Sequence, residues 1–392
     1  MLLTKQAVVL DMSGRKDNFV HKHQKGIGLE KLNPLLTHKK MDLHLAHTKA
    51  PLFGKTPTEL KAITESLGLP AFTARQISEW LYKKQVGSIE EMTNISKQNR
   101  EKIAQDYEVG LISHTNVQTS LDGTKKYLFP TSNNRFIETA YIPDADRATL
   151  CVSSQVGCKM GCLFCMTGKQ GFQSQLTAGE IVNQIISLPE REKLTNIVYM
   201  GMGEPFDNLE GVMKSVEILT SDWGLGMSPR RITVSTIGMI PAMKHYIENS
   251  DCHLAVSMHT PFHDERKKLM PIENVYPLAQ LIELLRDYDF GKQRRISFEY
   301  IMFKGINDTP RHVKEIARLL NGLRCRINLI RFHPIPDTPL QSSDEATIQE
   351  FKEALVKKGI RTTVRASRGQ DIFAACGLLS TKELVKQQTP DF

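Results

Sequence analysis

The sequence predicts an α/β fold: a partial (βα) TIM-like barrel with a small N-terminal helical domain and a β extension. Three observations support this prediction. From residue 148 on, short β-rich apolar runs alternate with helical patterns, and parallel strands joined by helices are the economical arrangement for such alternation. A stretch with helix-capping motifs precedes these runs, and a segment with an Asp-Gly turn lies between the two. No run approaches the roughly 18 apolar residues that span a bilayer, which excludes a membrane protein.

The first 50 residues carry more than half of the excess positive charge of the chain. The 392 residues have a formal net charge of +8, and this stretch holds nine Lys and Arg against four Asp and Glu, a net of +5, with five of the twelve histidines. A nucleic-acid-binding arm, a metal-binding tract and a flexible variable tail compete as interpretations. We expect the tail, and a second tail over 381–392. The stretch resembles neither a secretory signal nor an organellar presequence, which favours a cytoplasmic location.

Residues 51–110 have the pattern of a small helical domain. The segment Thr56–Glu59 is a capping box with proline at the first helical position, and apolar residues recur on one face up to Gly68. A second capping box, Thr73–Gln76, predicts a basic helix that runs to Lys84. We therefore expect a small helical domain ahead of the barrel.

Two aromatic residues of the second helix, Trp80 and Tyr82, have two interpretations. They stack on nucleic-acid bases, or they belong to the core of the helical domain while the neighbouring lysines form a solvated face. The sequence leaves both open.

In residues 111–147 the helical pattern gives way to alternating runs, which predict the β extension. Alternating runs flank Asp122-Gly123, a pair typical of a hairpin turn. This segment leads into the barrel, which we place at 148–380.

The barrel strands are predicted from seven short runs. They are Thr149–Ser153, Asn196–Met200, Arg231–Thr236, His253–Ser257, Ile296–Met302, Arg326–Arg331 and Arg361–Arg365. The first connecting helix begins at a capping box, Thr177–Glu180, and Pro189 ends it. In such barrels the chemistry lies at the C-terminal ends of the strands.

A cysteine motif follows the first of these strands. Cys158, Cys162 and Cys165 form a CxxxCxxC loop, and their clustering in a chain with seven cysteines indicates a metal or redox site. Structural zinc needs a fourth ligand at a matching spacing, but the nearest histidine downstream is His245. Three thiolates can instead hold one 4Fe-4S cluster and leave one iron open to chelate S-adenosylmethionine.

Residues at the ends of later strands are candidates to bind S-adenosylmethionine. They are Gly203, Glu204, Ser235, Ser257, Met258, His259 and His333. Glycines allow the backbone to approach a ligand, and the carboxylate, hydroxyl and imidazole groups can bind its amino, ribose and carboxylate groups. Each residue alone is equally well explained as a satisfied polar group, but all of them fall where a barrel binds its ligand.

The cysteine loop resembles that of the radical S-adenosylmethionine superfamily, and longer motifs resemble one family within it. The segments Arg147–Cys158, Gly201–Pro205 and Ala374–Gly377 look like those of the RlmN family, the dual-specificity adenine-C2 methyltransferases of 23S rRNA and tRNA. The resemblance extends from about residue 52 to about residue 380. It implies a barrel of the radical S-adenosylmethionine type, and it places the cluster on Cys158, Cys162 and Cys165.

By this resemblance, the reaction uses two molecules of S-adenosylmethionine and two further cysteines. The first methylates Cys376, and a radical derived from the second takes hydrogen from the S-methyl group, which then adds to adenine C2. Cys151 resolves the adduct by forming a disulfide with Cys376. Glu138 matches the family's proton acceptor. At His333 better-known relatives carry Asn, and imidazole can also donate or accept.

The resemblance also implies partners: 23S rRNA, tRNA and an electron donor such as flavodoxin or ferredoxin. The helical domain is then the RNA-positioning module. C8 methylation of the same rRNA adenosine and a noncatalytic iron-sulfur or zinc RNA-binding protein are the alternatives, and the Cys151 and Cys376 pair argues against the second. Cys252 and Cys325 are isolated, so we interpret them as small buried apolar residues.

Overall fold

The computed structural model describes residues 49–291 and 294–381. The two predicted tails lie almost wholly outside these residues. Within them, no helix is long and apolar enough to cross a bilayer.

A single ten-stranded sheet organises the main body, in the order β14-β13-β12-β11-β10-β9-β6-β5-β4-β3. Seven consecutive strands of this sheet run parallel to one another: β6 (Arg147–Cys151), β9 (Asn196–Tyr199), β10 (Ile232–Thr236), β11 (His253–Ser257), β12 (Ile296–Met302), β13 (Cys325–Arg331) and β14 (Arg361–Val364). Each coincides with a predicted run to within two residues at either end. Among the described residues β14 and β3 do not pair, so the barrel is partial, as predicted.

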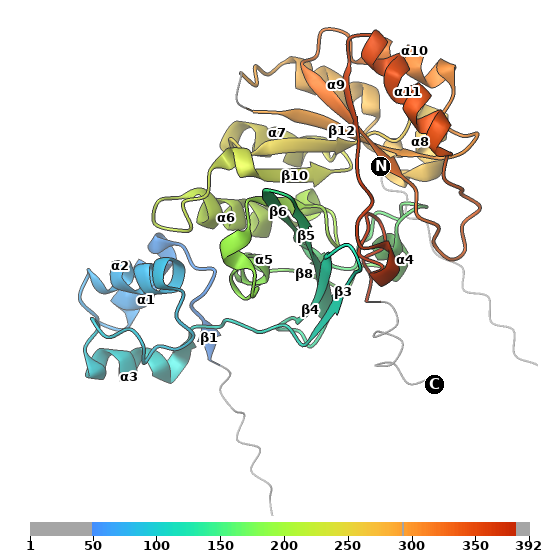
Figure 1. Cartoon of the computed structure of the whole chain (residues 1–392). Coiled ribbons are helices and arrows are strands. Elements are labelled where there is room, and N and C mark those ends of the chain that lie inside the picture. Colours follow the sequence, from blue (N-terminus) through green and yellow to red (C-terminus); the bar gives the residue numbers. More distant parts are fainter. Residues whose placement is uncertain (1–48, 292–293, 382–392) are drawn as a thin grey trace, which may run out of the picture. The chain divides into compact units, whose positions relative to one another are not determined.

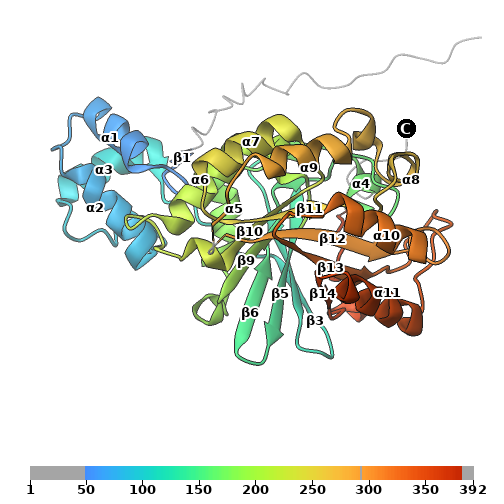
Figure 2. The ribbon, with the colours of Figure 1, turned by 90° about the horizontal axis from the view of Figure 1, so that it is seen from above.

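Helices cover the outer face of the parallel strands (Figures 1 and 2). They are α5 (Ala178–Ile186), α6 (Leu209–Thr220), α7 (Ile240–Asn249), α9 (Leu278–Arg286), α10 (Pro310–Leu319) and α11 (Glu345–Lys357). In β12, Phe298 and Tyr300 are fully buried, and the Tyr300 ring stacks on Phe351 of α11. The alternate residues Ser297 and Glu299 therefore point to the opposite, inner face of the sheet.

Several shorter elements connect these strands and helices. They are α4 (Met166–Gln170), α8 (His263–Leu269), the strand pair β7 (Gln155–Val156) and β8 (Ser174–Gln175), and the 3-10 turns Arg191–Lys193, Pro205–Asn208, Pro229–Arg231, Pro271–Asn274 and Gln370–Ile372. The capping box at Thr177 is confirmed, since Thr177 and Glu180 exchange hydrogen bonds. The helix ends at Ile186, before Pro189.

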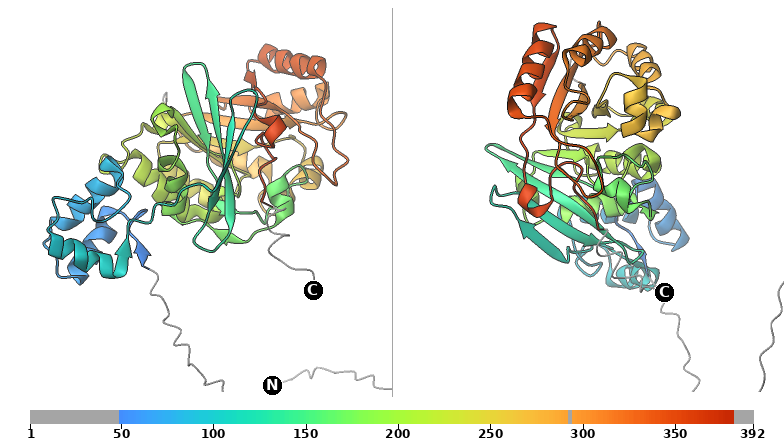
Figure 3. Two further views of the ribbon diagram at one scale, coloured as in Figure 1. Left: turned by 60° about the horizontal axis from the view of Figure 1, so that its bottom comes forward. Right: turned by 90° about the vertical axis from the view of Figure 1, so that its right-hand side faces the viewer.

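Three antiparallel strands extend the sheet beyond β6. They are β3 (Asn116–Thr119), β4 (Lys125–Pro130) and β5 (Phe136–Asp144), and β5 pairs antiparallel with β6. The predicted hairpin turn is confirmed, because Gly123 has φ of 83° and Asp122 accepts from the Thr124 amide. Figure 3 shows these strands beside the C-terminal segment.

The helical region contains α1 (Pro57–Ser66), α2 (Thr73–Glu79), a π-helical turn (Trp80–Lys84) and α3 (Lys97–Asp106). The strands β1 (Ala50–Pro51) and β2 (Tyr107–Glu108) pair in parallel and bring its two ends together. The capping box at Thr56 is confirmed by reciprocal hydrogen bonds with Glu59.

The second predicted capping box is wrong. The helix begins after Phe72, no side chain caps it, and Thr73 is itself a buried helical residue. Regular α-helix then gives way to the π-helical turn at Trp80. A threonine three residues before a glutamine has the sequence pattern of a capping box. Here the Thr73 amide instead donates to the Pro70 carbonyl, and this turn sets where the helix begins.

The stacking role considered for Tyr82 is also wrong. Tyr82 is 1% exposed, its hydroxyl donates to the Lys55 carbonyl and accepts from the Gly54 amide, and its ring packs edge-on against Trp223. Tyr82 therefore belongs to the core that joins the helical region to the barrel. One face of the Trp80 ring carries the Lys84 ammonium at 3.7 Å.

Candidate active site

One cavity of about 450 Å³ opens at the C-terminal ends of the parallel strands. It is lined by eleven of the predicted site residues: Cys151, Cys158, Cys162, Cys165, Gly203, Glu204, Ser235, Ser257, His259, His333 and Cys376. The structure therefore brings together residues that are more than 200 positions apart in the sequence. The two remaining predicted residues, Glu138 and Met258, do not line it.

The cysteine loop lies between the end of β7 and α4. Cys158 and Cys162 are buried and Cys165 is half-buried, and burial raises the pKa of the Cys158 thiol to about 12. A thiol must be deprotonated to bind iron, and a bound cluster supplies the positive charge that favours the thiolate.

The three thiols suit an iron-sulfur cluster better than a single metal ion. Within the described residues, no set of three His, Cys, Asp or Glu side chains is placed to hold a single metal ion. A 4Fe-4S cluster makes a different demand, because each cysteine binds its own iron. The donor set, three thiols lining one cavity, fits such a cluster.

Glu204 is fixed in the wall of the cavity by three donors. Its carboxylate accepts from the Thr236 hydroxyl at 2.6 Å, the Ile237 amide at 3.0 Å and the Phe206 amide at 3.1 Å. Burial raises the pKa of Glu204 to about 7. A cationic amino group bound in the cavity would favour its ionised form.

Gly203, which precedes this glutamate, has a backbone conformation that requires glycine. Its φ is 100°, and an added Cβ would lie 2.6 Å from the Gln155 side chain. The backbone of the turn therefore passes closer to Gln155 than any residue with a side chain would allow.

His259 links the strand ends to the cysteine loop. Its Nδ1 accepts from the Ile301 amide at 3.0 Å, and burial lowers its pKa to about 3. The ring is therefore neutral at pH 7, with its proton on Nε2. It packs edge-on against Phe164 of the cysteine loop, with 4.7 Å between the ring centroids.

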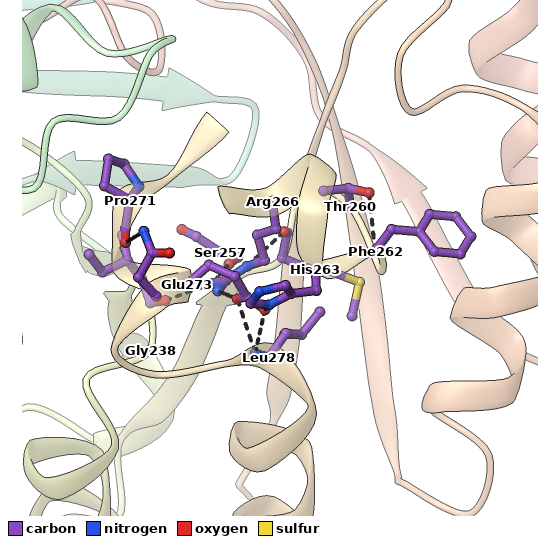
Figure 4. Close-up of polar contacts among 12 residues, drawn as sticks. Gly238, Ser257, Thr260, Phe262, His263, Arg266, Pro271, Glu273 and Leu278 are labelled. Carbon is purple, nitrogen blue, oxygen red and sulfur yellow. Dashed lines mark hydrogen bonds and ion pairs between the residues drawn. The ribbon is translucent and has the colours of Figure 1, made fainter. Parts of the chain in front are cut away.

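A buried arginine that the sequence did not single out holds two strand ends in place (Figure 4). Arg266 is 0% exposed and donates to the Ile237 carbonyl after β10 and to the Ser257 and Met258 carbonyls at the end of β11. Its charge is paired with Glu273, which also accepts from the Leu278 amide. Met258 is fully buried and contributes its backbone to this network.

Cys151 and Cys376 reach the cavity from different parts of the chain, and both thiols are free. Cys151 ends β6 and packs among Ala140 and Ala374, and its burial raises the pKa of the thiol. Cys376 follows the last 3-10 turn and is exposed to the cavity. Cys252 is buried as expected. Cys325, the first residue of β13, packs against the apolar core but is half-buried, so the prediction that it is buried holds only in part.

The segment that carries Cys376 is anchored at both ends. Before the cysteine, Asp371 accepts from the Ser120 hydroxyl at 2.6 Å and from the Leu121 amide, both in the β3-β4 turn. After it, the Leu379 carbonyl accepts from the Thr167 hydroxyl at 2.6 Å. Contacts with the β extension and with α4 therefore set the position of the thiol.

Arg365 is a cation beside these two thiols, and it was not predicted from the sequence. It follows β14, lines the cavity, and lies 3.3 Å from the Glu299 carboxylate. Glu299 in turn accepts from the Ser297 hydroxyl and the Asn328 amide group. Enclosure raises the pKa of the Cys376 thiol, and the positive charge of Arg365 opposes that shift.

Glu138 lies in the middle of β5, outside the cavity wall. Its carboxylate is 2.9 Å from the Lys126 ammonium and accepts from the Ser380 amide. Burial nevertheless raises its pKa. It shares a face of β5 with Ala140, which packs against Cys151.

The class of protein follows from the fold and the three-cysteine loop. The sequence model of the radical SAM superfamily matches residues 152–320, which include that loop, and a model described as the ribosomal RNA large subunit methyltransferase N-terminal domain matches residues 50–109. A radical SAM methyltransferase from Sphaerobacter thermophilus, known from its crystal structure, is 41% identical with a TM-score of 0.79, covering 84% of this chain and 99% of that one. The protein is a radical S-adenosylmethionine methyltransferase.

Curated relatives identify the family. A probable dual-specificity RNA methyltransferase RlmN of Bacteroides fragilis is 56% identical over 333 residues, which cover 85% of this chain and 97% of the relative. The dual-specificity RNA methyltransferase RlmN of Syntrophus aciditrophicus is 42% identical over 330 residues, 83% of this chain and 95% of the relative. The chain belongs to the RlmN family of radical S-adenosylmethionine RNA methyltransferases. The predicted family, barrel and enzyme class are confirmed.

Proposed function

We propose that this enzyme methylates C2 of an adenosine in 23S rRNA and in tRNA, and that the methyl group passes through Cys376. The observation that carries the proposal is the meeting of two free thiols, Cys151 and Cys376, in the same cavity as the three-cysteine loop. A simple RNA-binding protein has no use for such a pair. Adenine C2 is electrophilic, so a polar methyl transfer would require a prohibitively unstable carbanion, which the thiol route avoids.

In this proposal Cys376 acts first as a nucleophile. Its thiolate attacks the methyl carbon of one S-adenosylmethionine, and the sulfonium sulfur leaves with the bonding electrons. Arg365 stabilises the thiolate form by its positive charge. Cys158, Cys162 and Cys165 would hold the 4Fe-4S cluster, which when bound supplies the electron that cleaves a second S-adenosylmethionine to a 5'-deoxyadenosyl radical.

Cys376 then carries the one-carbon unit to the base. Its S-methyl group gives up a hydrogen atom to that radical, and the methylene carbon bonds to C2. The adduct gives one electron to the oxidised form of a one-electron carrier of the flavodoxin or ferredoxin class and loses its C2 proton, for which Glu138 is our candidate acceptor. Cys151 attacks the Cys376 sulfur, and the carbon leaves with the bonding pair and gains a proton to become the methyl group. The disulfide must afterwards be reduced.

Residues around the cavity would orient S-adenosylmethionine. Glu204 accepts from its amino group, while Ser235, Ser257, His259 and His333 reach its ribose and carboxylate. A cytoplasmic electron donor of the flavodoxin or ferredoxin class would serve the cluster. The target base must leave its stack to enter the cavity, so we expect it to be flipped or presented from a loop.

Product identity tests the proposal. The protein is reconstituted anaerobically with iron and sulfide, then given reductant, S-adenosylmethionine and either a 23S rRNA fragment or tRNA. We expect 2-methyladenosine by mass spectrometry, absent in Cys376→Ala and retained in Cys325→Ala, a matched variant outside the cavity. Formation of 8-methyladenosine would instead assign C8 chemistry, and no methylated RNA despite 5'-deoxyadenosine formation would refute the substrate.

A further inference from the structure

The inner face of the sheet carries charge where a closed barrel would carry packed apolar side chains. Glu299 points to this face and lines the cavity, and Ser297 and Asn328 bond to it there. Closer to the start of the parallel strands, the same alternation places three arginines on this inner face. They are Arg295, just before β12, Arg326 on β13 and Arg361 on β14.

The register of the strands puts Arg326 and Arg361 side by side, and Arg295 lies diagonally from Arg326, two residues before its partner Ser297. Ser297 pairs with Arg326, and Arg326 pairs with Arg361, while Arg295 donates to His253 of the neighbouring strand β11 at 3.0 Å. Burial, and after it the charges of the neighbouring arginines, lowers the pKa of Arg326. The same two causes lower the pKa of His253 to about 4.

Little negative charge lies near Arg295, Arg326 and Arg361, which we call the arginine row. Among the residues that the structure describes, none of the three has an acidic group within ion-pairing distance, whereas Glu299 is engaged by Arg365. Arg295 and Arg361 are exposed and Arg326 is half-buried. Holding like charges together costs free energy, and a polyanion bound to them would remove that cost.

The row is continuous with the cavity. Arg365 lies four residues beyond Arg361, about 13 Å along the strand direction at the rise of a β-strand. Arg147, at the start of β6, and Arg368 also line the cavity and share a single carboxylate, Asp144. Positive charge therefore extends along the inner face from the start of the strands to the rim where Cys376 lies.

We infer that Arg295, Arg326 and Arg361 bind phosphates of the RNA segment that adjoins the target adenosine, so that this segment lies along the inner face of the sheet. The inference rests on the proposed RNA substrate. Arginine binds phosphate through two parallel hydrogen bonds, and an extended or looped strand presents its phosphates in a row. Such contacts position the RNA without reading its sequence.

The experiment measures how RNA binding depends on salt. The triple variant Arg295→Gln, Arg326→Gln, Arg361→Gln is compared with Lys314→Gln, Lys357→Gln, Lys358→Gln, which removes the same charge from exposed positions on and beside the outer helices α10 and α11. Fluorescence anisotropy with the cluster-loaded enzyme gives affinities for a 23S rRNA fragment and a scrambled RNA of equal length over a range of KCl concentrations.

For the inner triple we expect the plot of log affinity against log salt to flatten by about 2, since each phosphate contact of a single strand contributes roughly 0.7. Both RNAs should weaken by the same factor, and the outer triple should keep the wild-type slope. An unchanged slope in the inner triple, or an equal loss in the outer triple, would overturn the inference. If the inner triple does not fold, Arg361→Gln alone should flatten the slope by about 0.7.

Methylation by the wild-type enzyme in the same samples separates the two proposals. A flatter slope in the inner triple, without any 2-methyladenosine from the wild-type enzyme, would support phosphate binding by the three arginines and refute the proposed reaction. Formation of 2-methyladenosine with an unchanged slope in the inner triple would refute only the proposed phosphate binding by these arginines.

Discussion

The guanidinium of Arg365 lies 3.3 Å from the carboxylate of Glu299, in the wall of the cavity that also holds Cys151 and Cys376. Glu299 fixes the arginine, and the arginine holds a positive charge beside two thiols whose pKa values are otherwise raised, that of Cys151 by burial and that of Cys376 by enclosure in the cavity. The pair thus connects the strand framework to the reactive sulfur atoms.

Replacing Arg365 by Gln should slow the methylation of Cys376. A neighbouring cation lowers a pKa by one to three units, so its loss should reduce the thiolate fraction at pH 7 by about tenfold or more and move the pH-rate profile to higher pH. The methyl content of the Cys376 peptide, followed by mass spectrometry, measures the rate. Arg365→Lys keeps the charge and should retain most of the rate; equal profiles for wild type and Arg365→Gln would contradict the role.

The buried pair of Arg266 and Glu273 should be essential for stability. Removing one partner leaves an uncompensated charge in the interior, so we expect Arg266→Met to cost about 3–5 kcal/mol in the free energy of unfolding, measured in urea. The double variant Arg266→Met, Glu273→Leu should recover part of this loss. A cost below about 1 kcal/mol in the single variant would show that Arg266 does not hold the strand ends.

Glu204 should make the stability of the cluster-free protein depend on pH. Its pKa rises from 4.5 to about 7 on folding, so the native state binds the proton more tightly than the unfolded state does. Its contribution is therefore fully present below about pH 4.5 and is lost as the pH rises through 7, by about 3 kcal/mol in total. The difference in unfolding free energy between wild type and Glu204→Gln should fall across this range; a constant difference would contradict it.

Cys151→Ala should trap the reaction after the carbon has bonded to the base. Without the resolving thiol the Cys376 sulfur cannot release the carbon, so a covalent complex of protein and RNA should accumulate and multiple turnover should stop. A denaturing gel with labelled RNA measures it. Normal turnover by Cys151→Ala would refute the resolving role, and Cys325→Ala is the matched control.

The sequence predicted the parallel strands well because each is a short apolar run with clear boundaries. The cysteine loop and the strand-end polar residues were also predictable, since spacing and position mark them directly. The start of α2 was not, because a Thr73–Gln76 pattern looks the same whether or not the side chain caps the helix.

Partners of charged residues could not be predicted in the same way. Arg365 and Glu299 are 66 positions apart, and only the pairing of β12, β13 and β14 brings them together. Arg266 is an ordinary basic residue in a helix with other basic residues until the fold buries it. Lateral neighbours in a sheet depend on register, which the sequence of one strand does not contain.

The most direct test of the account follows deuterium from the methyl donor. The reconstituted enzyme is given S-adenosylmethionine whose methyl group carries three deuterium atoms, with a 23S rRNA fragment as acceptor. Transfer through a methyl group on Cys376 predicts 2-methyladenosine with two deuterium atoms and 5'-deoxyadenosine with one. A product that retains all three deuterium atoms, or one formed equally well by Cys376→Ala, would contradict the account.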